Sequence, residues 1–105
     1  MIGALRERVT LQSPIRTADG AGGAAVTWDD GVSIWAKVEM RGGGETPAGE
    51  RLEARALVRM TIRYRSGITA EMRALWQGRA FNIRNLRDAD GRRRFLVLDC
   101  EEERP

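Results

Sequence analysis

The chain has 105 residues, a formal charge of +3 and a hydrophobic content of 42%, which suits one small domain with its own core. It has no histidine and one cysteine, Cys100. The usual general base, zinc fingers, Cys-x-x-Cys redox pairs and intramolecular disulfides are therefore excluded. No apolar run approaches the roughly 18 residues of a membrane span, and no signal-peptide core precedes Arg6. We expect one soluble domain over residues 1–105, without cofactor, metal or membrane contact.

Charge is unevenly distributed along the sequence. Residues 1–50 have a net charge of −2, residues 51–94 one of +8, and residues 95–105 one of −3. All 18 basic residues except Lys37 are arginines, whose forked donors suit carboxylates and phosphates. The sequence therefore predicts a protein surface or a DNA backbone as partner. It also suggests that the basic middle and the acidic N-terminal half form opposite sides of the domain.

The first half of the chain predicts three strands. The first is expected over Arg6 to Gln12, ended by Ser13-Pro14, and a short one over Val26 to Trp28, stopped by Asp29-Asp30-Gly31. Strict alternation from Ser33 to Met40 predicts a third, half-buried strand.

Two segments of the first half are rich in glycine and other turn-forming residues. They are residues 13–25 and 41–50, and we expect both to be long flexible loops.

Residues 52–63 alternate between apolar even positions and mostly polar odd positions. The apolar set is Leu52, Ala54, Ala56, Val58, Met60 and Ile62. Helix propensity favours a helix over residues 50–57. A strand is the preferred interpretation, because the β-rich segment Val58 to Tyr64 continues the same phase.

The last third of the chain predicts three more strands. They are expected over Met72 to Gln77, Ala80 to Leu86 and Arg92 to Cys100, with a hairpin turn at Asp88 to Gly91. The charged tail, residues 101–105, is expected to fray. Six or so short antiparallel strands, the Val26–Trp28 segment being very short, indicate a mainly all-β domain, either a small barrel or a sandwich.

An exposed tryptophan and an arginine face are the candidate interaction residues. Trp35 shares its strand face with Lys37 and Glu39, and Trp and Arg are enriched in protein interfaces. Four arginines share one face of the following strand by their odd phase. They are Arg51, Arg55, Arg59 and Arg63. This face could be solvated, contact another subunit or bind nucleic acid. The last role usually needs aromatic platforms, and only Tyr64 is near, on the opposite phase.

The remaining motifs favour structural interpretations. Cys100 ends an apolar strand and is expected to be a buried thiol. The glycine groups match neither a P-loop nor a dinucleotide fingerprint. No nucleophile with a base and no metal cluster can be assembled, so an enzyme is disfavoured.

The ordered motifs of the chain resemble the phage head-tail joining family, also called head-tail adaptor or head-closure proteins, including the versions in gene transfer agents. The similarity extends from Gly3 to Glu101. The motifs are Gly3-x-Leu5-Arg6-x-Arg8-Val9-x-Leu11, Asp19-Gly20-x-Gly22-Gly23, Val26-Thr27-Trp28, Ile34-Trp35-Ala36-Lys37-Val38, Gly44-Glu45, Thr61-Ile62-Arg63-Tyr64-Arg65 with Gly67-Ile68, Phe81-Asn82-Ile83, and Leu96-x-Leu98-x-Cys100-Glu101.

The resemblance implies a small β-barrel that forms a ring, expected to be a dodecamer, in a tailed-phage virion or phage-like particle. Made in the bacterial cytoplasm, the ring would lie between a portal or adaptor and a tail-side protein, join head to tail and help retain packaged DNA without reading its sequence. By the same resemblance, the 41–50 loop would project toward the channel or a neighbour. Its named residues are Arg41, Gly43, Gly44, Glu45 and Thr46.

Two other functions remain open at this stage. A free-standing basic barrel that binds nucleic acid non-specifically is the main alternative, supported by the arginine content. A host regulatory or toxin-related interaction module is the other.

Overall fold

The computed structural model describes residues 5–20, 22–41 and 56–103, and every regular element in these ranges is a β-strand. The strands are β1 (Glu7–Ala18), β2 (Ala24–Met40), β3 (Leu57–Arg63), β4 (Arg73–Trp76), β5 (Arg79–Asp88) and β6 (Phe95–Glu102). The all-β prediction is therefore confirmed.

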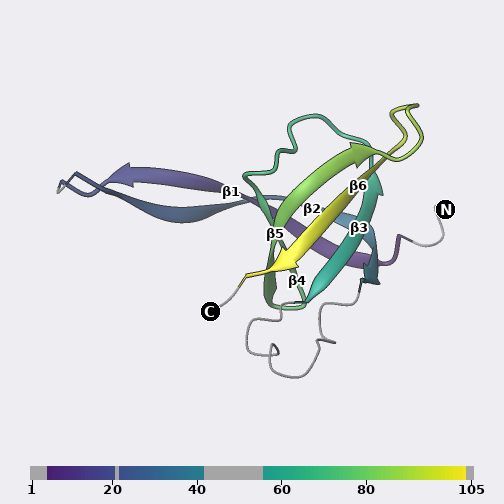
Figure 1. The fold of residues 1–105 in the computed structure, drawn as a ribbon, viewed down its shortest axis with the longest axis horizontal. Coiled ribbons are helices and arrows are strands. Elements are labelled where there is room, and N and C mark those ends of the chain that lie inside the picture. The colour runs from purple at the N-terminus through teal and green to yellow at the C-terminus, as the bar shows by residue number, and fades with distance from the viewer. Residues whose placement is uncertain (1–4, 21, 42–55, 104–105) are drawn as a thin grey trace, which may run out of the picture.

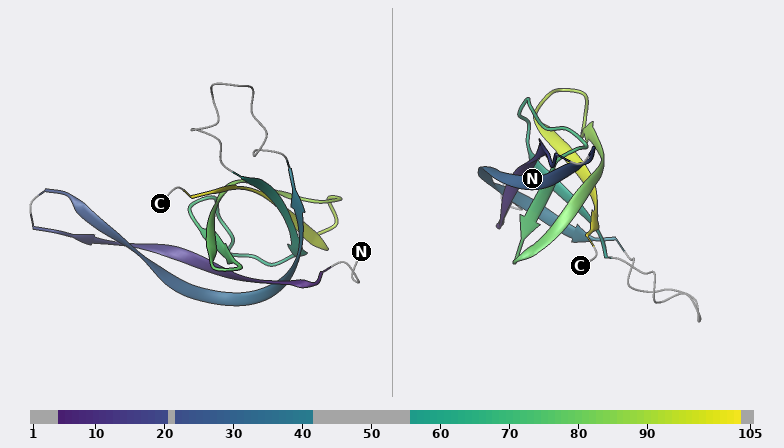
Figure 2. Two further views of the ribbon diagram at one scale, coloured as in Figure 1. Left: turned by 90° about the horizontal axis from the view of Figure 1, so that it is seen from below. Right: turned by 90° about the vertical axis from the view of Figure 1, so that its left-hand side faces the viewer.

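The six strands close into one antiparallel barrel in the order β1-β2-β3-β6-β5-β4 (Figures 1 and 2). Closure depends on three residue pairs between β1 and β4, namely Thr10 with Leu75, Leu11 with Ala74, and Gln12 with Arg73. Of the two architectures left open by the sequence, the structure has the barrel.

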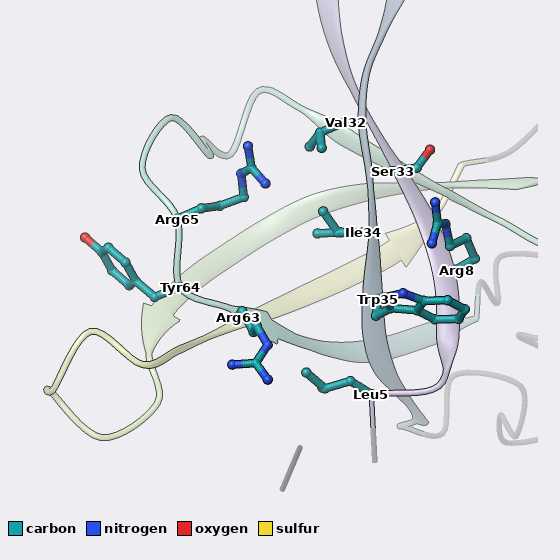
Figure 3. Close-up of a pocket in the computed structure, with 9 residues that line it drawn as sticks. All are labelled: Leu5, Arg8, Val32, Ser33, Ile34, Trp35, Arg63, Tyr64 and Arg65. Atoms are coloured by element: carbon teal, nitrogen blue, oxygen red, sulfur yellow. The ribbon is translucent and has the colours of Figure 1, made fainter. Parts of the chain in front are cut away.

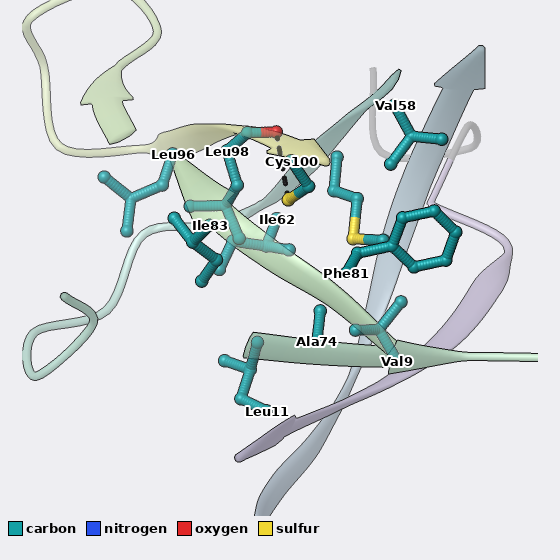
Figure 4. Packing of buried hydrophobic residues seen from close by; sticks show 12 residues of the cluster. Val9, Leu11, Val58, Ile62, Ala74, Phe81, Ile83, Leu96, Leu98 and Cys100 are labelled. Carbon is teal, nitrogen blue, oxygen red and sulfur yellow. Dashed lines mark hydrogen bonds between the residues drawn. The ribbon is translucent and has the colours of Figure 1, made fainter. Parts of the chain in front are cut away.

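Apolar side chains from all six strands fill the barrel. Of the segment 50–57, for which the sequence leaves helix and strand open, residues 50–55 lie outside the described ranges and Leu57 is the first residue of β3. Within β3 the predicted alternation is confirmed at the buried Val58, Met60 and Ile62. The largest fully buried side chain, Phe81, projects inward from β5 toward them (Figure 4). Cys100 lies in the same cluster as a free thiol. Its burial, and secondarily the charge of Asp99, raise its pKa to about 12, which leaves it protonated and unreactive near neutral pH.

The β1–β2 hairpin extends well beyond the barrel, and the strand ends predicted for this region are wrong. Residues 13–18 belong to β1 and residues 24–31 to β2. The loop expected over residues 13–25 is thus reduced to the turn between Ala18 and Ala24. We call Ser13–Ala18, this turn and Ala24–Asp29 the arm, which projects from the barrel in Figure 1.

Two local features explain the longer strands. β1 pairs with β4 only as far as Gln12, so Pro14 lies at a sheet edge, where a missing N–H is tolerated. The expected turn at Gly31 is a bulge, since the register of β1 with β2 shifts between Thr10 and Gln12. A β-carbon at Gly31 would lie 2.9 Å from the carbonyl oxygen of Leu11, so this crossing requires glycine.

The acidic C-terminal segment is paired with the basic middle of the chain. β6 lies between β3 and β5, and its Asp99 carboxylate accepts hydrogen bonds from Arg59 at 3.1 Å and from Arg87 at 3.0 Å. Three further ion pairs continue this pattern at its end. They join Arg84 to Glu101, Arg79 to Glu102 and Arg73 to Glu103.

These pairs correct two predictions. The tail does not fray from residue 101, because β6 continues through Glu102; residues 104 and 105 lie outside the described ranges. The basic middle does not form a side of its own either, because acidic β6 is inserted between its strands. The expected turn after Asp88 is present, with Asp88 accepting the backbone N–H groups of Asp90, Gly91 and Arg93. It is longer than predicted, because β6 begins at Phe95 rather than at Arg92.

We predict that Gly31→Ala lowers the free energy of unfolding by about 1–3 kcal/mol. The new methyl group would press on the Leu11 carbonyl, a backbone atom held in the barrel at the crossing. Thermal denaturation followed by circular dichroism measures the effect. Thr27→Ala on the exposed arm is the control and should change stability by less than about 0.5 kcal/mol. Equal melting temperatures for Gly31→Ala and the wild type would contradict the assignment.

We predict a pH-dependent loss of stability in Asp99→Asn. Partial burial alone would raise the pKa of Asp99, but hydrogen bonds from Arg59, Asn85 and Arg87 outweigh it and lower the pKa below 3.8. The ionised carboxylate therefore stabilises the fold above pH 3.8, and this contribution is lost as the pH falls through the lower folded-state value. Melting curves should separate wild type from variant at pH 7 and converge in strong acid. A gap that stays constant would count against these ion pairs.

Candidate assembly interface

A groove of about 520 Å³ lies beside β2 and the end of β3 (Figure 3). It combines aromatic, aliphatic and basic side chains from β1 and the residue Leu5 before it, from β2, and from the end of β3 and the segment that follows it. The lining residues are Leu5, Arg8, Val32, Ser33, Ile34, Trp35, Arg63, Tyr64 and Arg65. We call this surface the Trp35 groove.

Strand register positions the aromatic centre of the groove. Arg8 of β1 lies directly opposite Trp35 of β2, which places both side chains on the same face of the sheet. The guanidinium carbon of Arg8 lies 4.8 Å from the centre of the Trp35 ring, a cation–π distance. Trp35 is still 52% exposed, and Tyr64 is 38% exposed, so both rings are available for contact.

The Trp35 groove follows an open edge of β2. Side chains alternate along a strand, so Val32 and Ile34 lie on one face while Ser33 and Trp35 lie on the other. A single groove that includes all four must therefore wrap around the strand edge. On this side β3 pairs with β2 only from Ala36 to Met40. Among the described residues, no strand covers β2 from Trp35 back to Ala24.

The groove is electropositive. Within the described ranges, no carboxylate forms an ion pair with Arg8, Arg63 or Arg65. This contrasts with the ion-paired arginines of β3 and β5, the two strands beside β6. The groove therefore offers cations and exposed aromatic rings together, the side chains that dominate binding energy in protein interfaces.

The structure brings together two of the sequence-predicted interface residues, Trp35 and Arg63, in the groove. Arg59 lies elsewhere: it pairs with Asp99 and lines a second hollow of about 240 Å³ together with Arg41 and Leu57. The other predicted residues lie outside the described ranges. They are Arg51 and Arg55 on the strand side, and Gly43, Gly44, Glu45 and Thr46 in the 41–50 loop.

Sequence reasoning missed Leu5, Arg8, Tyr64 and Arg65 as groove residues. Strand phase predicts that Tyr64 lies on the face opposite the arginines, but β3 ends at Arg63, so alternation no longer applies to it. A regular long hairpin centred on the Asp19–Gly23 turn would place Arg8 opposite Ile34. The register shift between Thr10 and Gln12, which the sequence does not reveal, moves it opposite Trp35.

The other two tryptophans stabilise the barrel and the base of the arm. The indole N–H of Trp76 donates to Glu7 at 3.0 Å, and its ring packs against Phe81. The Arg73 guanidinium lies 4.3 Å from the Trp28 ring and donates to the Gln12 side chain at 2.6 Å. Arg73 therefore ties β4 to β1 and to the first residues of the arm.

Neither a metal site nor a membrane-spanning helix is present among the described residues. No group of three or more His, Cys, Asp or Glu side chains there could hold a metal ion. No helix there is long and apolar enough to cross a bilayer.

Comparisons with known proteins find matches that cover almost the whole chain. The family model for phage head completion proteins matches residues 1–103. A chain in the virion of a native gene transfer agent particle superimposes with a TM-score of 0.79, at 25% identity, over 95% of this chain and 96% of that one. A protein from Shigella flexneri 2a, solved in solution, gives a TM-score of 0.70 and 34% identity, over 96% and 95%. No curated protein matches significantly.

We predict that Trp35→Ala leaves the fold almost as stable as the wild type, because the ring is half exposed and contributes little to the core. The matched control, Phe81→Ala, should cost about 3–5 kcal/mol, because it opens a cavity inside the barrel. Urea denaturation compares the two variants. A loss of stability in Trp35→Ala as large as that in Phe81→Ala would show that Trp35 is structural rather than an interface residue.

Proposed function

The chain belongs to the phage head completion protein family, and we propose that it forms a ring between a portal or adaptor and a tail-side protein. In this role it would join the DNA-filled head to the tail and help retain the genome in a phage or phage-like particle. The observation that carries the proposal is the family match over residues 1–103. The fold shared with a chain of a gene transfer agent virion supports it.

The surface of the barrel supports a ring subunit. A ring built from identical copies needs two unlike surfaces on each copy, because each contact is heterologous. The described residues provide an arm, the Trp35 groove and the second hollow around Arg41 and Leu57. We assign the groove, with Trp35 and Arg63, to a contact with another protein subunit.

The remaining interface residues stay within this proposal. Arg51, Arg55 and Arg59 would extend the contact surface along the chain before and within β3, although Arg59 already has Asp99 as a partner. The 41–50 loop would contact the channel or a neighbour, and Arg41 marks where it leaves β2. A dodecamer, with DNA passing through the channel, is the assembly we propose.

One observation favours a second function, non-specific binding of nucleic acid. The groove places Trp35 and Tyr64 among Arg8, Arg63 and Arg65, a combination of stacking rings and cations that suits single strands. A gel shift with purified protein at about 50 mM salt tests this directly. Binding that weakens steeply with salt would favour it, and no shift would leave the connector role.

We predict that particles from a strain lacking this gene contain DNA-filled heads without tails. Expression of the wild-type protein in trans should restore tailed particles. Trp35→Ala with Arg63→Glu should fail to restore them, although the variant protein should remain folded by circular dichroism. Arg92→Ala in the exposed turn between β5 and β6, outside both the arm and the groove, is the control. Electron microscopy counts the two classes of particle, and normal tailed particles in the deletion strain would contradict the proposal.

A further inference from the structure

The arm and the Trp35 groove point to a specific contact between copies of the chain. We propose that the arm of one copy docks in the Trp35 groove of the next and lies along the open edge of β2. This inference rests on the proposed ring and identifies the surfaces that would hold neighbouring subunits together.

The arm lacks the support that a two-stranded hairpin needs. Beyond Gln12 it has no third strand among the described residues, and an isolated hairpin is marginally stable in water. Its two large aliphatic side chains, Ile15 and Val26, are 45% and 47% exposed. Both faces of the arm are thus open to solvent, and a partner would bury apolar surface on it.

Register shows how the arm is composed. Pro14 lies opposite Trp28 and Arg16 opposite Val26, so these four residues share one face. Ile15 and Thr27 share the other face with Ser13 and Asp29. The arm also carries Asp19 at its turn. It therefore has two carboxylates against the single guanidinium of Arg16.

The groove complements the arm in charge and in its open strand edge. Its three arginines, Arg8, Arg63 and Arg65, have no carboxylate partner in the described ranges, whereas the arm has an excess of negative charge. The uncovered edge of β2 between Val32 and Trp35 can accept an added strand, a recurring mode of recognition. The flanking rings of Trp35 and Tyr64 provide the apolar contact.

The arm is unable to reach the groove of its own chain. β2 runs without interruption from Ala24 in the arm to Trp35 in the groove, so one continuous strand joins the two surfaces and sets their separation. Figure 1 shows the arm projecting away from the barrel. The contact must therefore form between copies. Because the two surfaces differ, each copy can donate its arm to one neighbour and accept the arm of another. Such a heterologous contact closes into a ring where the rotation between copies allows it, as the proposed assembly requires.

Photocrosslinking in assembled particles tests the contact. The photoreactive residue p-benzoylphenylalanine replaces Val26, particles are irradiated, and the captured peptides are identified by mass spectrometry. We expect covalent multimers of this chain, with crosslinks to the segment around Trp35 or to Arg63–Arg65. The same residue in place of Arg92, in the β5–β6 turn, is the control and should not capture the groove.

A second variant separates docking from folding. Arg63→Glu should reduce crosslinking from position 26 at least tenfold while leaving the melting temperature unchanged. Crosslinks only to other virion proteins, only to other regions of this chain, or only to DNA would each overturn the arm–groove contact. The same holds for multimers that Arg63→Glu does not reduce. None of these outcomes affects the head-closure role, which fails only if the deletion strain makes normal tailed particles.

Discussion

Closure of the barrel between β1 and β4 is the constraint on which the rest of the structure depends. Only Thr10, Leu11 and Gln12 pair with β4, and within these residues β1 must have neighbours on both sides. The bulge opposite Leu11 lets β2 stay paired with β1 at the point where β1 also pairs with β4. Gly31 allows the close approach of β2 to the Leu11 carbonyl, because it has no side chain. Past Gln12 the two strands leave the barrel together. The closure that completes the core therefore also creates the arm.

The length of β2, which allows it to extend beyond the barrel, also accounts for the groove. β2 is 17 residues long, whereas β3 has only seven, so β3 can cover only the end of β2 that belongs to the barrel. The uncovered edge begins at Trp35, where Arg8 lies opposite and Arg63 ends the neighbouring strand. Arm and groove are thus two consequences of one difference in strand length, and a change in the register of β1 with β2 would alter both.

The sequence predicts an element correctly where the evidence lies in that element's own residues. It fails where the extent of a strand depends on the strands with which it pairs. The alternation of Val58, Met60 and Ile62 identifies β3 because one face of that strand is buried. Pro14 and Gly31 suggest strand ends, since local turn chemistry contains no information about an edge position or a bulge. Glu101 and Glu102 look like a solvated tail until β5 supplies Arg84 and Arg79.

For the candidate site, an exposed Trp35 was predictable from its polar neighbours, but its arginine partners depend on register and on where β3 ends. Strand phase alone placed Arg59 and Arg63 on one surface. In the structure they have different roles, because Asp99 pairs with Arg59 whereas Arg63 lines the groove. Sequence phase identifies a shared face but gives no information about which of its members already has a partner.

The distribution of paired and unpaired arginines gives the net charge of +3 a structural meaning. Acidic β6 lies between basic strands and neutralises Arg59, Arg87, Arg84 and Arg79 within the subunit. Intramolecular pairing of this kind suits a surface that needs no further charged partner. Arg8, Arg63 and Arg65 have no such pairing and gather around exposed rings at an open strand edge. An acidic strand that covered this surface would pair with the cations, contact the rings and form backbone hydrogen bonds with the strand edge. A phosphate backbone would leave the edge of β2 without hydrogen-bond partners.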